Sequence, residues 1–371
     1  MFFLHFILFT ILEISFISTN NKIITDKFSF VSNAYKISFK INPLPFFALT
    51  EINLNSNIFW INKEHYAGID FSSLYTHQYK QIHLPTNNST SIEIEAQITN
   101  SSMTLFSNDT FSIKNISFYL VHKKLEGIWD SIGLGFFDNS NYNMSIVHLL
   151  YKQKLISNLQ FGFSKFDERK VFYGGIPIEY TINKFQSKCK IKSNIWGCSI
   201  SKILFNNTGF IYYNNNDYAE INTNQGSISV PSLFMEYFKS YLQEYMNGRN
   251  YRFNTKYYCS CSQINDFPAL IFVINGKEFE MNRDDLFEER YGTCVMLIEE
   301  NVKDNTKWIL GNAFLRKYYS LFDYEKKEII FYSDTLFKEN STLFYLIIKI
   351  MSFTMIINGC IMYFIYCKEL K

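Results

Sequence analysis

The chain has 371 residues, which is enough for two domains of ordinary size or one large two-lobed unit. Hydrophobic residues make up 47% of it, so it can supply a substantial core, and its formal net charge is only +2. A charge this close to balance, without a basic block, argues against nucleic acid as a partner.

The chain begins with an apolar run that ends at Ser18. The run is short for a membrane span and stands at the very start, so we predict a signal peptide over residues 1–19. It lacks the usual basic residue at its front and contains Glu13. A buried strand or an uncleaved anchor is the alternative.

The middle of the chain shows the alternation of apolar and polar residues that is typical of half-buried strands. We predict strands at residues 35–41, 91–95, 111–118 and 327–332. Helical patterns are scarce and are found at residues 232–247, directly after Pro231, and at residues 312–319. Many short strands with few helices predict a mostly β fold.

A second apolar stretch, residues 343–366, has the length of a transmembrane helix. Lys349 interrupts it near its start, where a lysine side chain can reach the headgroups. We therefore predict a single-pass membrane protein of the secretory pathway, with its main domain in the lumen or outside the cell. An interfacial amphipathic helix is the alternative.

Sequons and cysteines fit that compartment. Glycosylation sequons begin at Asn87, Asn88, Asn100, Asn108, Asn115, Asn143, Asn206 and Asn340, which predicts a glycoprotein. The cysteines between the two apolar ends are Cys189, Cys198, Cys259, Cys261 and Cys294, and we expect two disulfides and one thiol left over. No second Cys/His pair at zinc spacing accompanies Cys259 and Cys261, so we predict no metal site and no cofactor.

A faint repeat links the two halves of the chain. Residues 51–55 read Glu-Ile-Asn-Leu-Asn and residues 220–224 read Glu-Ile-Asn-Thr-Asn. Trp60 follows Asn53 by seven positions, and Pro231 follows Asn222 by nine. This order and spacing resembles the pepsin-like aspartic proteases, in which each lobe carries an Asp-Thr/Ser-Gly motif at the corresponding place.

Other landmarks of that family follow in the same order. Residues 130–136 are similar to its Asp-Gly-Ile-Leu-Gly-Leu segment, residues 172–176 to the segment that closes the first lobe, and residues 308–316 to its Trp-Ile-Leu-Gly-Asp-x-Phe-Leu-Arg signature. The resemblance implies a bilobal pepsin-like acid-protease fold with a central cleft. The N-terminal lobe would span residues 30–178 and the C-terminal lobe residues 179–335.

The resemblance also bears on the disulfides. It implies a Cys261–Cys294 bridge by position. For Cys189–Cys198 we infer a second bridge, from the short separation and the Trp-Gly turn between the two cysteines. Cys259 has no counterpart in the family.

Both positions at which the family carries its catalytic aspartates read asparagine, at Asn53 and Asn222. The family's reaction uses two carboxyl groups that share one proton: one takes a proton from water and the other polarises the scissile carbonyl. An amide has no proton to exchange near working pH and is a very poor base. We therefore predict that these two positions are inactive.

The same resemblance indicates which residues surround the cleft. By position alone, Ser56, Trp60 and Thr223 would line or support it. The position of the family's flap tyrosine falls on Gln97, and the usual Tyr-Gly-Thr-Gly pattern is absent. The ligand of such a cleft would be an extended polypeptide.

Three functions remain open from the sequence. The leading hypothesis is a pseudoprotease that binds polypeptide without cleaving it. The second is an active aspartic-type endopeptidase that carries out proteolysis. It requires carboxylates lent by Glu51 and Glu220, deamidation of both asparagines, or a different alignment of the motifs. Two residues along a strand move a charge by about 7 Å, which is too far for the same water, and neither asparagine precedes the glycine that makes deamidation easy. The third is a non-enzymatic surface or structural protein, because fold alone does not fix function.

Overall fold

The computed structural model of the chain describes residues 22–31, 34–42, 44, 47–66, 69–71, 74–85, 91–105, 112–122, 130–136, 145–192, 194–205, 211–245, 251–253, 256–302 and 304–335. The predicted signal peptide and the predicted transmembrane helix at residues 343–366 both lie outside these ranges. Within them, no helix combines the length and the apolar character that a bilayer span requires.

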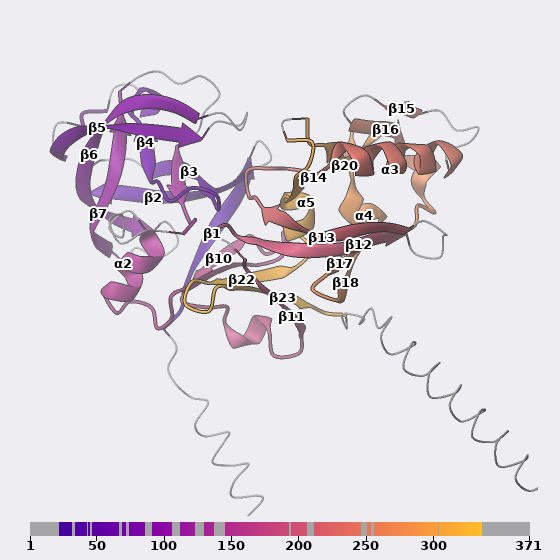
Figure 1. Cartoon of the computed structure of the whole chain (residues 1–371). Coiled ribbons are helices and arrows are strands. Elements are labelled where there is room, and N and C mark those ends of the chain that lie inside the picture. The colour runs from indigo at the N-terminus through magenta and orange to yellow at the C-terminus, as the bar shows by residue number, and fades with distance from the viewer. Residues whose placement is uncertain are drawn as a thin grey trace, which may run out of the picture.

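The first lobe and the base of the molecule share one thirteen-stranded sheet (Figure 1). Its strands, in the order in which they pair, are β11 (Phe185–Lys190), β23 (Glu328–Ser333), β22 (Tyr319–Asp323), β9 (Gln160–Phe163), β10 (Lys170–Tyr173), β1 (Ile24–Val31), β2 (Ala34–Asn42), β3 (Phe47–Asn53), β8 (Ser131–Gly133), β4 (Trp60–Asn62), β7 (Ser112–Val121), β6 (Ser91–Leu105) and β5 (Tyr75–Pro85). The predicted strands at residues 35–41, 91–95, 111–118 and 327–332 correspond to β2, β6, β7 and β23.

The second lobe is built on a ten-stranded sheet. Its strands, in pairing order, are β15 (Tyr251–Phe253), β16 (Lys256–Ser260), β20 (Thr293–Glu300), β14 (Ile228–Val230), β21 (Trp308–Leu310), β13 (Ile211–Ile221), β12 (Gly197–Phe205), β17 (Leu270–Ile274) and β18 (Lys277–Met281), and β19 (Phe287–Arg290) pairs with β20. Two sheets with few helices confirm the mostly β, bilobal architecture.

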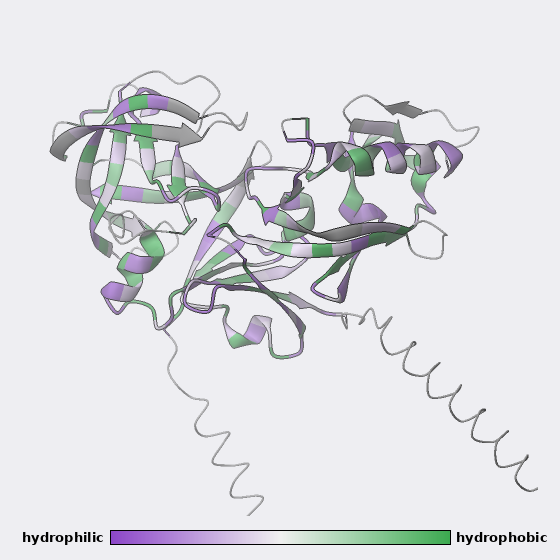
Figure 2. Ribbon diagram, viewed as in Figure 1, coloured by the Kyte–Doolittle hydropathy of each residue, from purple (hydrophilic) through white to green (hydrophobic). Residues whose placement is uncertain are grey.

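The helices of the described part are short: α2 (Ile146–Lys152), α3 (Ser232–Tyr245), α4 (Arg283–Leu286), α5 (Asn312–Leu315) and the 3-10 turns η1 (Lys63–Tyr66), η3 (Ile178–Tyr180) and η4 (Cys261–Ile264). The helix predicted at residues 232–247 is α3, whose apolar side buries Phe234, Met235, Phe238 and Leu242 (Figure 2). The helix predicted at residues 312–319 is shorter than expected, because the chain turns after α5 and enters β22 at Tyr319.

The two lobes repeat one arrangement of strands. In the first lobe β3 runs parallel to β8 and β4 runs parallel to β7, while β4 and β8 are antiparallel. In the second lobe β13 and β21, and β14 and β20, form the parallel pairs, and β14 and β21 are antiparallel. The sequence repeat therefore has a structural basis: Asn53 ends β3, and Asn222 directly follows the equivalent strand β13.

Aromatic side chains join the lobes beneath this repeat. Phe161 of β9 stacks on Phe322 of β22 with ring centroids 4.7 Å apart, so residues from both halves of the chain form one core. The Leu134 carbonyl accepts hydrogen bonds from the Trp196 indole N–H at 2.8 Å and from the Tyr324 hydroxyl at 2.9 Å. Side chains from the C-terminal half thus hold the segment that follows β8.

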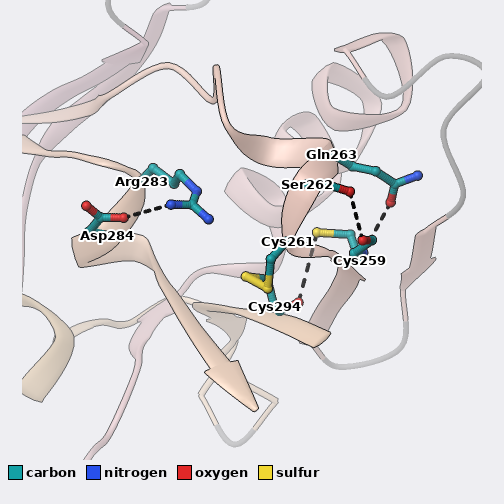
Figure 3. The surroundings of a disulfide bond; sticks show 8 residues. Cys259, Cys261, Ser262, Gln263, Arg283, Asp284 and Cys294 are labelled. Carbon is teal, nitrogen blue, oxygen red and sulfur yellow. Dashed lines mark hydrogen bonds and ion pairs between the residues drawn. A yellow bond between two sulfur atoms is a disulfide. The ribbon is translucent and has the colours of Figure 1, made fainter. Parts of the chain in front are cut away.

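Both predicted disulfides are confirmed. Cys189 bonds to Cys198 with Cα atoms 5.8 Å apart, and Cys261 bonds to Cys294 with Cα atoms 4.9 Å apart. Cys259 is a free, buried thiol that stands opposite Cys294 in the β16–β20 pairing (Figure 3). Burial raises the pKa of Cys259 to about 11, so it stays a protonated thiol of low reactivity.

Helix α2 was not predicted from the sequence. This helix carries His148, whose protonation affects the stability of the fold. Ser145 caps the helix by accepting the His148 N–H at 3.3 Å, and its hydroxyl lies 2.7 Å from His148 Nδ1. The His148 ring also packs against Tyr324 at a centroid distance of 5.1 Å. Burial lowers the pKa of His148 from 6.5 to about 4.

We expect stability to fall between pH 6.5 and pH 4 in part through His148. In this window the unfolded chain binds a proton at His148 that the folded chain does not, so acid favours unfolding, and the effect levels off below pH 4. Denaturant unfolding at several pH values checks this. The variant His148→Gln should show a shallower decline, and an identical pH dependence in both proteins would contradict the assignment.

Candidate functional site at the lobe junction

The two asparagines of the repeat hold their loops in the same way. The Asn53 side-chain oxygen accepts the Asn55 N–H at 2.9 Å, and the Asn222 side-chain oxygen accepts the Asn224 N–H at 2.8 Å. Each is an Asx turn, in which the side chain fixes the backbone two residues further on. The side-chain oxygen of each asparagine is therefore engaged by the backbone of its own loop.

Each loop lies directly on a glycine of a neighbouring strand or turn. A Cβ on Gly133 would stand 2.5 Å from the Ser56 carbonyl oxygen, and one on Gly311 would stand 2.2 Å from the Ser227 carbonyl oxygen. In the first lobe the contact is completed by the Gly135 N–H, which donates to the Ser56 carbonyl at 2.8 Å. Only glycine permits approaches this close, so these two glycines determine how closely each loop packs against the neighbouring backbone.

One side chain ties the two loops together. The Thr223 hydroxyl donates to the Ile52 carbonyl at 2.5 Å, and the Thr223 carbonyl in turn accepts from the Asn312 amide at 2.8 Å. Ile52 precedes Asn53 and Thr223 follows Asn222, so this bond joins the two segments that carry the asparagines. The equivalent residue in the first lobe is Leu54, which has no hydroxyl and cannot donate the corresponding hydrogen bond to the second lobe.

We expect Thr223→Val to destabilise the lobe junction. Thr223 is buried, and valine leaves the buried Ile52 carbonyl without this donor, which costs about 1–3 kcal/mol of unfolding free energy. Thr223→Ser keeps the hydroxyl and is the matched control. Denaturant unfolding distinguishes them: equal stabilities for the valine and serine variants would show that the hydrogen bond contributes nothing.

The other predicted binding residues, Ser56, Trp60 and Gln97, lie in three different surroundings. Ser56 lies in the first loop, 7% exposed, and its hydroxyl accepts the Ile58 N–H at 3.1 Å. Trp60 opens β4 and is only 1% exposed, so it supports the loop from the core. Gln97 lies within β6, opposite Tyr79 of β5, with its amide oxygen 3.1 Å from His122 Nε2. Its role in binding stays a prediction.

The two glutamates that precede the asparagines have different surroundings. Glu51 is buried and forms an ion pair at 3.6 Å with Lys36, which is fully buried. Burial raises the pKa of Glu51 and lowers that of Lys36, and in each case the charge of the partner opposes the shift. Glu51 therefore belongs to an internal ion pair, which argues against its lending a carboxylate to the position of Asn53.

Glu220 instead reaches the other lobe. The side-chain NH₂ of Asn55, in the first loop, donates a hydrogen bond to a Glu220 carboxylate oxygen. Burial raises the pKa of Glu220, opposed first by the charge of Lys307 and then by the Asn55 bond. The sequence placed Glu220 on the same strand face as Asn222 but gave no indication of this cross-lobe contact, because Asn55 and Glu220 are far apart along the chain.

Among the residues that the structure describes, no group of three or more His, Cys, Asp or Glu side chains could hold a metal ion.

Comparisons with known proteins agree with this architecture. The chain matches the family profile described as eukaryotic aspartyl protease over residues 59–333, a range that includes Asn222 and begins just after Asn53. It is 28% identical over 182 residues to pregnancy-associated glycoprotein 1 of Bos taurus, covering 47% of this chain and 46% of that protein. It is 24% identical over 157 residues to gastricsin of Homo sapiens, covering 41% of this chain and 39% of that protein.

The matched segments thus span less than half the length of these curated relatives. A solved structure shows the likeness of the fold over a longer range. The aspartic proteinase from Irpex lacteus superposes with a TM-score of 0.66 at 13% identity, covering 86% of this chain and 99% of that one.

Proposed function

The chain belongs to the eukaryotic aspartyl protease family, and from this premise we propose that it is a pseudoprotease that binds extended polypeptide between its lobes without cleaving it. The observation that carries the proposal is the pair Asn53 and Asn222. Both stand where the family's mechanism needs carboxyl groups, and both use their side-chain oxygens to accept backbone N–H groups. Neither amide can take a proton from water.

The surrounding residues support a loss of catalysis in a protein that keeps the backbone structure of both loops. The loops rest on Gly133 and Gly311, and Thr223 still joins them. The neighbouring carboxylates do not restore the dyad, because Glu51 is paired with Lys36 and Glu220 is a single carboxyl group bonded to Asn55. A fold that keeps its loops in place can still present backbone and amide groups to an extended peptide.

We further propose that the protein works in the secretory pathway, anchored by residues 343–366 with its lobes in the lumen or outside the cell. Two disulfides in the described part support an oxidising compartment. The apolar length of residues 343–366 supports the anchor. The ligand in this proposal is a polypeptide or a segment of a protein.

Cleavage of a diverse peptide library between about pH 3 and pH 6 tests the catalytic part of the proposal. We expect the native chain to leave the library intact, because the general acid–base pair is absent. The double variant Asn53→Asp with Asn222→Asp is the matched control. Its carboxylate oxygens can accept the same backbone N–H groups, so we expect it to cleave at least about 100-fold faster than the native chain.

Cleavage by the native chain that pepstatin blocks would overturn the pseudoprotease assignment in favour of an active aspartic endopeptidase. If the native chain neither cleaves nor retains any peptide from the library, binding fails as well. The protein would then be a non-enzymatic surface or structural protein.

A further inference from the structure

The pseudo-symmetry of the lobes places two glutamates in equivalent positions with unequal partners. Glu51 of β3 pairs in register with Lys36 of β2, and Glu220 of β13 pairs in register with Gly197 of β12. Residues directly opposite in an antiparallel pair point to the same face, so the first glutamate meets a cation across the strands. The second meets a residue without a side chain.

The glycine opposite Glu220 is required by the packing of the second lobe. A Cβ on Gly197 would lie 2.4 Å from the Ala219 carbonyl oxygen and 2.6 Å from the Tyr218 ring. No lysine can therefore occupy this position to neutralise Glu220 as Lys36 neutralises Glu51. The second lobe carries the carboxylate of the repeated pattern without its cation.

The remaining neighbours of Glu220 place no cation in direct contact with its carboxylate. On the other side of β13 it faces Ile309 of β21, which is apolar, and across the junction it accepts from the neutral amide of Asn55. The nearby cation is Lys307, whose ammonium group is paired with Asp304 at 3.5 Å. Among the described residues, no basic side chain lies within ion-pair distance of Glu220.

Glu220 is also accessible from the place where a ligand would lie. It is partly exposed, two residues before Asn222, and Asn55 beside it is exposed in the loop that follows Asn53. Figure 1 shows β3 and β13 approaching the junction from opposite lobes. A carboxylate in this position offers an acceptor and a negative charge beside the first loop, next to the Asn55 amide.

We propose that Glu220 forms a subsite for a lysine or arginine side chain of the polypeptide held between the lobes. The ligand would supply the cation that Gly197 cannot. The inference rests on the proposed function, since it names the class of residue that the same site prefers. Burial raises the pKa of Glu220, so the preference should strengthen as pH rises above the ordinary glutamate value of 4.5, and fade as acid neutralises the carboxylate.

Two matched peptide libraries test the subsite on the full-length protein in detergent. All peptides are N-acetylated and C-amidated, so that no terminal charge contributes. One library carries a single arginine per peptide, and the other carries citrulline, its neutral isostere, at the same positions. At pH 7 we expect the retained arginine peptides to bind about tenfold more tightly than their citrulline partners, as for a hydrogen bond to a charged group.

Glu220→Gln should bring the two libraries within about twofold of each other, since the amide keeps the shape and loses the charge. The control is Glu325→Gln, which removes an exposed charge in the turn between β22 and β23 and should leave the preference unchanged. If Glu220→Gln does not fold, as judged by its melting curve, the wild-type protein alone decides. Its arginine preference must then decline between pH 7 and pH 4.5.

The outcomes separate this inference from the proposed function. Equal retention of both libraries by the wild-type protein overturns the cation subsite while peptide binding stands. An arginine preference that survives in Glu220→Gln, or that ignores pH, assigns the recognition to another group and also overturns it. If neither library is retained, peptide binding itself fails, and the subsite fails with it.

Discussion

The hydrogen bond from the Thr223 hydroxyl to the Ile52 carbonyl is the constraint on which the candidate site depends. It spans 2.5 Å between segments 171 residues apart in the chain. On either side of it, the backbone of each loop lies in close contact with a glycine, Gly133 in the first lobe and Gly311 in the second. A side chain at either glycine would displace the loop. The positions of Asn53 and Asn222 therefore follow largely from backbone contacts and from one hydroxyl.

This explains why the fold tolerates two asparagines where the family carries aspartates. A carboxylate and a primary amide share one acceptor oxygen of similar geometry, and that oxygen is what each loop uses to bind the backbone N–H two residues on. The local structure needs an acceptor, whereas the reaction needs an exchangeable proton. Under the proposed function, asparagine keeps the acceptor that the loop needs and lacks the exchangeable proton that the reaction needs.

The sequence predicted features that depend on spacing and missed those that depend on register. The helix at Ser232–Tyr245 was readable from its periodicity, and the Cys189–Cys198 bridge from the short separation of its cysteines. The resemblance to a known family gave the repeat at Asn53 and Asn222 its meaning and implied the Cys261–Cys294 bridge. The ion pair between Lys36 and Glu51 was not readable, because a one-residue shift in the pairing of β2 with β3 would separate them. For the same reason the strand pattern indicated the face on which Glu220 lies but not its partner.

The two lobes keep their symmetry in the backbone and break it in the side chains near the junction. In the first lobe Leu54 stands where the second lobe has the Thr223 hydroxyl, and Glu51 is paired with the buried Lys36. Both residues of the first lobe therefore contribute to internal packing. In the second lobe Thr223 provides the tie, and a glycine leaves Glu220 open toward the other lobe. Partly burying a carboxylate without a paired cation costs stability. A fold that retains such a group at the junction is better explained by a ligand that completes the pair than by the needs of the core.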